Sequence, residues 1–259
     1  MDRTKIEEYR FLASVKGKTF SELNPPMKRL IEKLFGEGDR IEPFSCDLCN
    51  RFSKPDIYLA FGKRMKYISL KFGRSDSIHF ETIKSLVLFL RGLGVSSETQ
   101  KTILLFHYGD GTLDGSGTRR FLFEECFSLI KDRIKKANEE LNKKSIIREC
   151  LRRFLFRGTE ARRIEVDALV FGSADYFVFA TKEEIEKHVL SKRYGHIRTL
   201  HIGPMTLQPY IRDAKRQSKY PEKRTRAQIK WHYLLSDIEQ IMRSNGRFDA
   251  IPAQHSAHS

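Results

Sequence analysis

An acid and a lysine stand at the two ends of a short hairpin pattern. Two apolar runs, at residues 57–61 and 67–72, are separated by a polar turn, and this arrangement predicts a β-hairpin. Asp56 opens the first strand. Lys71 projects near the end of the second strand, two positions after Ser69 and therefore on the same face. A carboxylate that can hold a hard cation and a lysine that can offset negative charge thus converge.

The residue order around this hairpin resembles a known nuclease motif. Pro55-Asp56 followed by Ser69-Leu70-Lys71 resembles the PD-(D/E)xK phosphodiesterase superfamily, with serine where the family usually has an acid. A metal-dependent nuclease needs about two carboxylates to anchor a divalent ion beside the scissile phosphate. The serine therefore raises the question of where a second carboxylate comes from.

Glu81 is the candidate for that second carboxylate. It lies ten residues past Lys71, in a segment at residues 78–93 whose apolar positions predict a helix. An SxK motif paired with a glutamate relocated to the next helix resembles a subgroup of type II restriction endonucleases. The alternative is that Glu81 only favours the helix N-terminus through its charge.

The resemblance implies the roles of the site residues. Mg²⁺ would be held by Asp56, Glu81 and the backbone carbonyl of Leu70, while Lys71 would orient or help deprotonate the attacking water. Ser69 would support the site. Two further residues are possible accessories: His79, which is equally explained as structural, and Glu32, which is equally explained as an exposed helix residue.

The flanking segments agree with the core of this superfamily, which runs helix, strand, strand, strand, helix, strand. Residues 24–35 predict an amphipathic helix with Asn24 as its cap. Residues 41–46 predict the first strand, and residues 102–108 predict a buried central strand. The expected fold class is α/β (α+β mixed), a restriction-endonuclease-like core with a mixed β-sheet flanked by helices and a basic α/β C-terminal part.

Charge is unevenly distributed along the chain. The net charge is +15 over 259 residues, and most of it lies in two segments. Residues 131–163 hold 12 basic and 5 acidic residues, and residues 191–231 hold 11 and 2. This pattern favours a polyanionic partner, here double-stranded DNA. A helix over residues 130–155 is expected to follow the DNA phosphates.

The second basic segment combines cations, glutamine, proline and glycine, and is expected to form loops that reach base edges. A basic solvated loop is the alternative. The candidate DNA-binding residues are Gln208, Arg212, Lys215, Arg216, Lys219, Lys223, Arg224 and Arg226.

The expected domains are a nuclease core at residues 1–125, a basic α/β DNA-recognition part at 126–250, and a flexible tail at 251–259. Strands at residues 165–171 and 176–180 and a helix reaching Leu190 predict a small α/β unit in the second part. A closing helix is expected at residues 227–242, with Trp231 in the core.

Other motifs are weaker. The Cys46 and Cys49 pair lacks further ligands for zinc, Asp167 is interpreted as structural, and the loop starting at Asp110 lacks the glutamate of a calcium loop. The sequence contains no ATPase motif, so no nucleotide cofactor is expected. It contains no long apolar run and no signal peptide, so no membrane contact is expected, and the protein is expected to be cytoplasmic.

The leading hypothesis is a Mg²⁺-dependent endonuclease that cuts duplex DNA at a short specific sequence, acting as a homodimer if the target is palindromic. One alternative is a catalytically degenerate DNA-binding protein with a nuclease fold. Another is a DNA repair or recombination nuclease.

Overall fold

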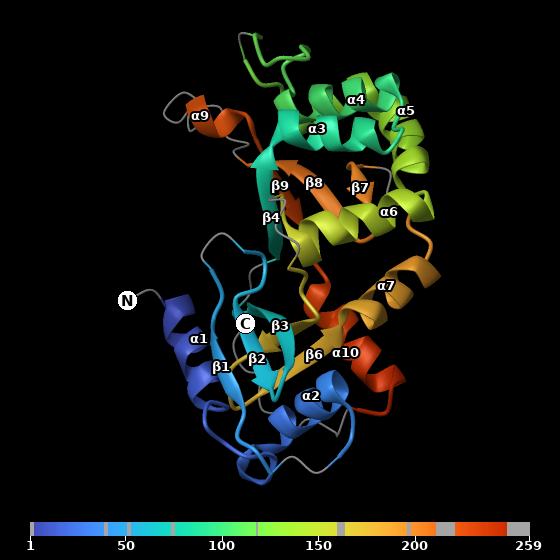
Figure 1. The fold of residues 1–259 in the computed structure, drawn as a ribbon. Helices are drawn as coiled ribbons and strands as arrows, with labels where there is room; N and C mark the ends of the chain where they lie inside the picture. The colour runs from blue at the N-terminus through green and yellow to red at the C-terminus, as the bar shows by residue number, and fades with distance from the viewer. Residues whose placement is uncertain are drawn as a thin grey trace, which may run out of the picture. The chain divides into compact units, whose positions relative to one another are not determined.

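The computed structural model describes residues 3–38, 41–50, 53–73, 76–117, 119–159, 164–195, 198–210 and 221–247. The chain forms two compact units, each made of segments that are far apart in the sequence (Figure 1). The boundaries differ from the continuous division expected at residue 125, because strands from the later part of the chain complete the sheet of the first unit. The first unit comprises Met1–Ser75, Arg162–Ile185 and Leu234–Ser259, and the second unit comprises Asp76–Ala161 and Glu186–Tyr233.

A five-stranded mixed sheet lies at the centre of the first unit. Its order is β1-β2-β3-β5-β6, and all neighbours are antiparallel except β3 and β5, which are parallel. The predicted hairpin is confirmed, and its second strand begins early because a tight turn at Gly62, with φ +57°, places Arg64 opposite Phe61. The strands are β1 (Ser45–Leu48), β2 (Ile57–Phe61), β3 (Arg64–Lys71), β5 (Ala168–Gly172) and β6 (Phe177–Thr181).

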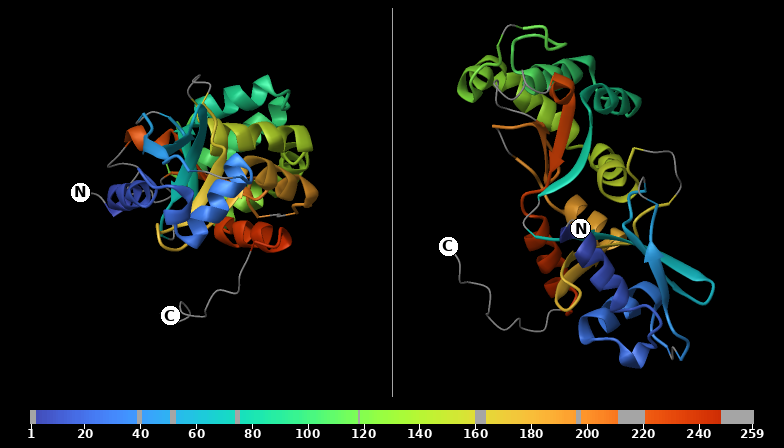
Figure 2. Two further views of the ribbon diagram at one scale, coloured as in Figure 1. Left: turned by 60° about the horizontal axis from the view of Figure 1, so that its bottom comes forward. Right: turned by 90° about the vertical axis from the view of Figure 1, so that its left-hand side faces the viewer.

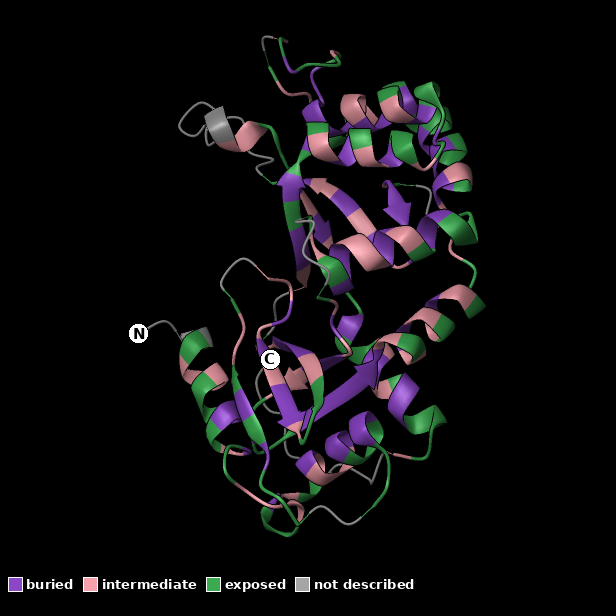
Figure 3. Cartoon of the chain, viewed as in Figure 1, coloured by how far each residue is buried: buried purple, intermediate pink, exposed green. Residues whose placement is uncertain are grey.

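The helix predicted at residues 24–35 is confirmed as α2. Asn24 accepts a hydrogen bond from the Met27 N–H at 2.9 Å, and Pro25 and Pro26 occupy the first turn, where no N–H is needed. Its apolar stripe is buried (Figure 3), and α2 and α10 both contact β6. The helices of this unit are α1 (Arg3–Ala13), α2 (Pro25–Phe35) and α10 (Leu234–Ser244), with a 3₁₀ turn, η1, at Phe20–Glu22.

The strands and helix predicted between residues 165 and 190 are confirmed as β5, β6 and α7 (Lys182–Ser191). The capping box is present, because the Thr181 N–H donates to Glu184 Oε2 at 3.0 Å and the Glu184 N–H donates to Thr181 Oγ1 at 3.4 Å. These strands extend the sheet of the hairpin, since Ser69 lies opposite Leu169 in the parallel pair.

The second unit is built on a four-stranded antiparallel sheet of order β4-β9-β8-β7. Figure 2 shows β4 and β9 running side by side. None of the helices in the described ranges combines the length and apolar character that a bilayer crossing requires. The strands are β4 (Ser77–Thr82), β7 (His201–Ile202), β8 (Met205–Pro209) and β9 (Arg226–Lys230), and the helices are α3 (Ile83–Gly92), α4 (Ser97–Tyr108), α5 (Phe123–Leu141), α6 (Lys144–Leu151), the π-helical η2 (Arg152–Arg157) and α9 (Pro221–Arg224).

One predicted strand is wrong, and another has different bounds. Residues 102–108 belong to the helix α4, because Ser96 caps its start by accepting from the Thr99 N–H at 3.3 Å and Gly109, in the left-handed region, ends it. The first strand covers Ser45–Leu48 and not residues 41–46, and Ile41 is 85% exposed.

Three predicted helices are also corrected. The segment at residues 78–93 starts as strand β4 and becomes helical only at α3, after Thr82 caps it. The segment at 227–242 is strand β9 followed by α10, with Trp231 buried between them as expected. The segment at 130–155 is divided between α5, α6 and η2. In the first two cases, pairing of β4 with β9 overrides the local helical pattern.

Candidate functional site

Asp56 is fixed directly onto strand β3 of the first unit. Its Oδ2 accepts a hydrogen bond from the Leu70 N–H at 2.6 Å and another from the Ser69 hydroxyl at 3.0 Å. Its own N–H donates to the carbonyl of Ile68 at 2.9 Å, the residue that lies opposite Ile57 in the β2–β3 pair. The half-buried carboxylate is therefore held in one place at the end of the hairpin.

Ser69 is fully buried, and its hydroxyl binds the Asp56 carboxylate. An acid at this position would face the Asp56 carboxylate with like charge, whereas the serine hydroxyl donates a hydrogen bond to it. The serine thus holds the Asp56 carboxylate in place without adding a second negative charge.

The N–H and C=O groups of Leu70 both point to the side of β3 on which Asp56 lies. Because the N–H and C=O of one strand residue point the same way, and the Leu70 N–H bonds Asp56, the Leu70 carbonyl is directed to that side as well. An aspartate oxygen and a backbone carbonyl therefore lie at the same edge of β3.

Two lysines stand near this carboxylate. Lys71 is half-buried at the end of β3, and strand alternation places it on the face of Ser69. Burial and the positive charge of Lys71 together lower the pKa of Lys54 to about 7, although the negative charge of Asp56 opposes the shift. Lys54 is thus close enough to Asp56 and Lys71 to interact with their charges. Lys54 is not among the residues predicted from the sequence, although its place directly before Pro55-Asp56 was the available signal.

The other acids predicted or discussed for the first unit have different surroundings. Glu32 is exposed on α2. Asp167 is a structural residue, because its two carboxylate oxygens bind Lys66 Nζ at 3.0 Å and the Tyr67 N–H at 2.8 Å. It ties the start of β5 to β3, and this agrees with its interpretation as structural.

Glu81 lies in strand β4 of the second unit, not in the first turn of a helix. Its buried carboxylate forms a two-bond pair with Arg153, at 3.1 Å from Nε and 2.7 Å from Nη2. Arg153 also donates to the Ser85 hydroxyl at 2.9 Å and lies 4.5 Å from the ring centre of Phe89. The dipole explanation of Glu81 is therefore wrong as stated, since the glutamate precedes the helix and pairs with an arginine 72 positions away.

His79 adds to the surroundings of Glu81. Its Nε2 lies 3.4 Å from Glu81 Oε1, and its ring stacks on Phe154 with the centres 5.3 Å apart. Burial alone would raise the pKa of Glu81, but hydrogen bonds from His79 and Arg153 and the charge of Arg153 lower it to about 2. The glutamate is thus ionised under all ordinary conditions.

The structure therefore brings together Asp56, Ser69, Leu70 and Lys71 in the first unit, and Glu81 and His79 in the second. Within the described ranges, no group of three or more His, Cys, Asp or Glu side chains is arranged to hold a metal ion.

Several predicted DNA-binding residues lie on or beside the sheet of the second unit. Gln208 on β8 is half-buried and donates to Thr206 Oγ1 at 3.1 Å, and Arg226 at the start of β9 is exposed. Lys223 lies in the short helix α9. The other four candidates, Arg212, Lys215, Arg216 and Lys219, lie outside the described residues.

Arg224 has a buried partner. Its Nη2 binds Asp110 Oδ2 at 2.8 Å, and the Asp110 side chain is fully buried. Asp110 also accepts from the N–H groups of Thr112 and Gly117, and the Arg224 carbonyl lies 2.9 Å from His107 Nε2. The loop after α4 thus anchors the chain just before β9.

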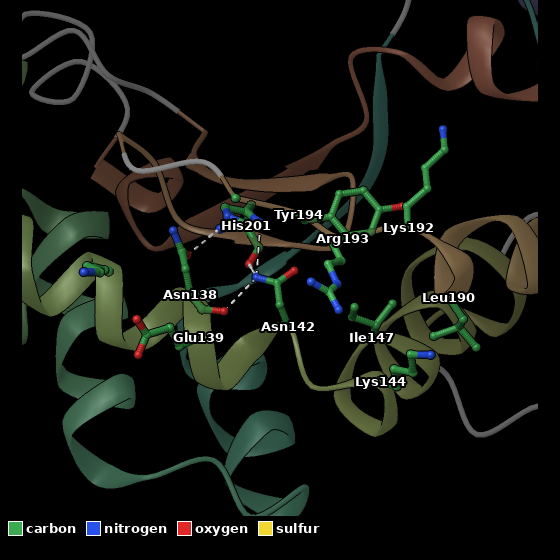
Figure 4. A pocket seen from close by; sticks show the side chains of 12 residues that line it. Asn138, Glu139, Asn142, Lys144, Ile147, Leu190, Lys192, Arg193, Tyr194 and His201 are labelled. Carbon is green, nitrogen blue, oxygen red and sulfur yellow. Dashed lines mark hydrogen bonds between the residues drawn. The ribbon is translucent and has the colours of Figure 1, made fainter.

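The two basic segments meet at a cavity of about 480 Å³ in the second unit (Figure 4). Asn138 and Asn142 connect its floor to β7, since Asn138 Oδ1 accepts from the His201 N–H at 3.1 Å and Asn142 Nδ2 donates to the His201 carbonyl at 3.1 Å. Figure 4 shows Arg193 extending between Asn142 and Ile147. The cavity favours an anion, because four cations and one acid line it: Lys135, Lys144, Lys192, Arg193 and Glu139.

The mixed sheet flanked by helices has a restriction-endonuclease-like fold. A solved structure of restriction endonuclease MspI in complex with its cognate DNA resembles this chain with a TM-score of 0.50. The two chains are 13% identical, and the match covers 87% of this chain and 88% of that chain. No protein-family model matches the sequence, and no curated protein matches it either.

Proposed function

We propose that this protein is a Mg²⁺-dependent endonuclease that cleaves duplex DNA at a short specific sequence. The observation that carries the proposal is the Asp56 carboxylate bound to the Ser69 hydroxyl and Leu70 N–H, with Lys71 at the end of the same strand. The likeness to a restriction endonuclease supports the fold in which such a site acts. The site is then a variant of the PD-(D/E)xK motif with serine in place of the second acid.

The donor atoms at this edge fit a hard divalent cation. Among the described residues, both hydrogen bonds to the Asp56 carboxylate end on Oδ2, so Oδ1 can ligate a cation together with the Leu70 carbonyl. Bound Mg²⁺ would polarise the phosphate and lower the pKa of a water. Glu81 remains the proposed additional ligand, although in the second unit it is paired with Arg153.

The protein side chains have separate tasks in the proposed hydrolysis. Asp56 would bind the cation, and Ser69 holds that carboxylate in place by donating a hydrogen bond to it. Lys71 orients the attacking water and offsets the charge that builds on the phosphate. The group that attacks is a water oxygen, and the bond that breaks is a phosphodiester P–O bond.

Binding of the duplex is assigned to the second unit. The two basic segments supply phosphate contacts, including the cations around the cavity at Asn138 and Asn142. Base contacts are assigned to Gln208 and to the cationic residues before β9. For a palindromic target, a homodimer presents one site to each strand.

One alternative is a DNA-binding protein that keeps the nuclease fold without activity. The observation that favours it is that Glu81, the proposed second carboxylate, forms a buried pair with Arg153. A repair or recombination nuclease would share the chemistry at Asp56 but not the specificity for a short sequence.

The test compares Asp56→Asn and Lys71→Ala with two matched controls. Asp175→Asn changes an exposed acid in the turn between β5 and β6, and Lys63→Ala changes an exposed lysine in the hairpin turn. Plasmid cleavage in Mg²⁺ should fall at least ~10²-fold in the site variants and stay unchanged in the controls. Binding of duplex DNA in Ca²⁺ should survive in all four. Cleavage by Asp56→Asn at the parental rate would refute the site, and binding without any cleavage by the parental protein would favour the inactive DNA-binding protein.

A further inference from the structure

The sheet of the second unit has one face covered by helices. On that face His79 stacks on Phe154, and Leu207 and Ile229 are buried. Because side chains alternate along a strand, the intervening residues point the other way. We call this second side the open face; its members are exposed or half-buried, namely Phe80, Gln208, Tyr210, Arg226, Gln228 and Lys230.

The strand register places these residues in rows. Phe80 lies opposite Gln228, and Gln228 lies opposite Gln208, so two glutamines and one aromatic ring form a row across β4, β9 and β8. Neighbouring strands are about 4.8 Å apart, so the side-chain amides of Gln208 and Gln228 lie close enough to bind neighbouring groups of one ligand. Phe80 and Tyr210 are 45% and 40% exposed and meet edge to face, with the ring centres 5.3 Å apart.

Two cations flank the glutamines on β9. Arg226 is exposed, two residues before Gln228, and Lys230 lies two residues after it. Lys230 binds Asp76 at 3.1 Å, and His232 binds the same carboxylate at 2.5 Å, so one acid faces this end of the sheet. The surrounding segment, residues 191–231, holds 11 basic and 2 acidic residues and complements a polyanion.

We propose that the open face lies in the major groove of duplex DNA and that Gln208 and Gln228 read A·T base pairs there. This inference rests on the proposed function, because it assigns part of the sequence specificity of that enzyme. A glutamine amide carries an NH2 donor group beside a carbonyl acceptor, which complements the N7 acceptor and N6 amino donor of adenine in the major groove. Sheets are known to read DNA in this way.

The dimensions of β9 agree with this assignment. Four residue steps at about 3.3 Å each separate Arg226 from Lys230 by roughly 13 Å, while the major groove is about 12 Å wide. Arg226 can therefore approach the phosphates on one side while Gln228 projects into the groove, and Lys230 would exchange its pairing with Asp76 for a phosphate on the other side. Phe80 supplies an apolar contact suited to a thymine methyl group.

In the experiment, the full chain in Ca²⁺ selects binding sites from a duplex DNA pool with a randomised centre. The selection is then repeated with Gln228→Ala and with Gln208→Ala. Gln240→Ala is the matched control, since Gln240 is an exposed glutamine on α10 in the first unit. Thermal unfolding of each variant checks that it is folded. The selected parental site should contain A·T pairs, and Gln228→Ala should lose preference at one of them about tenfold or more.

The outcomes separate this inference from the proposed function. If the parental protein binds a specific site and Gln228→Ala and Gln208→Ala keep every base preference, the open face does not read DNA, although the enzyme can still be a nuclease. A site made only of G·C pairs would also overturn the inference. If the parental protein neither binds nor cleaves duplex DNA, both the inference and the proposed function fail.

Discussion

Replacing Glu81 by Gln should destabilise the second unit strongly, whether or not Glu81 has a catalytic role. The carboxylate is 3% exposed and makes two bonds to Arg153, whose side chain is 17% exposed. Removing one partner of a buried pair typically costs about 3–5 kcal/mol, because the other charge stays buried. The lowering of the Glu81 pKa from 4.5 to about 2 corresponds to about 3 kcal/mol, in agreement.

A double-mutant cycle isolates this pair. Glu81→Gln and Arg153→Met should each lower the free energy of unfolding by about 3 kcal/mol, and the double variant should lose clearly less than the sum. Urea unfolding followed by the fluorescence of Trp231, the only tryptophan, reports on this unit because that side chain is 2% exposed. Glu98→Gln is the matched control, since Glu98 pairs with Lys101 on the surface of α4 and its loss should have no measurable effect. If Glu81→Gln is as stable as Glu98→Gln, the reasoning is refuted.

The same variants decide between the two roles of Glu81. Cleavage is measured at low temperature, where the folded fraction of each variant is verified by fluorescence. A metal ligand predicts that Glu81→Gln loses at least ~10²-fold in rate while Arg153→Met, which keeps the carboxylate, retains activity. A purely structural pair predicts that both variants cleave at the parental rate once folded.

Two further predictions concern charge and pH. The two basic segments carry +7 and +9, which predicts that affinity for duplex DNA falls steeply with salt, with a slope of several units in log K against log salt. Fluorescence anisotropy measures this affinity. An affinity that does not change with salt would exclude phosphate contacts as the main source of binding. Burial lowers the pKa of His107 to about 4, and the charges of Arg120 and Arg224 contribute, against the bond to the Arg224 carbonyl. The unfolded chain then binds a proton that the folded chain does not, so stability is complete above pH 6.5 and falls by about 3 kcal/mol as the pH decreases to 4. Urea unfolding across that range should show a flatter slope for His107→Gln, and an equal slope would contradict this.

The candidate catalytic edge could be predicted from the sequence because it is local. Asp56 and Ser69 are 13 positions apart and are joined by one hairpin, whose two apolar runs and turn are visible in the residue pattern. The helix α2 was predictable for the same reason, since Asn24 and the following prolines fix its start within one turn.

The errors lie where distant segments decide the structure. The run at residues 102–108 is apolar and short, a pattern that strands and buried helices share. Segments β4 and β9 carry helix-like spacing but pair with each other across about 150 positions. The partners of Arg224 and Glu81 are 114 and 72 positions away, so no local pattern revealed that these side chains are engaged in buried pairs.

The surroundings of Asp56 also link metal binding to DNA binding in the proposed reaction. Ser69 donates to this carboxylate where an acid would have added a second negative charge, and Lys71 brings positive charge to the same group. Proteins usually hold Mg²⁺ through one or two carboxylates together with substrate phosphates. With one carboxylate in the first unit, the proposed site would need the DNA phosphate to complete the ligands of the cation. We therefore expect cation binding at Asp56 to be stronger when duplex DNA is bound.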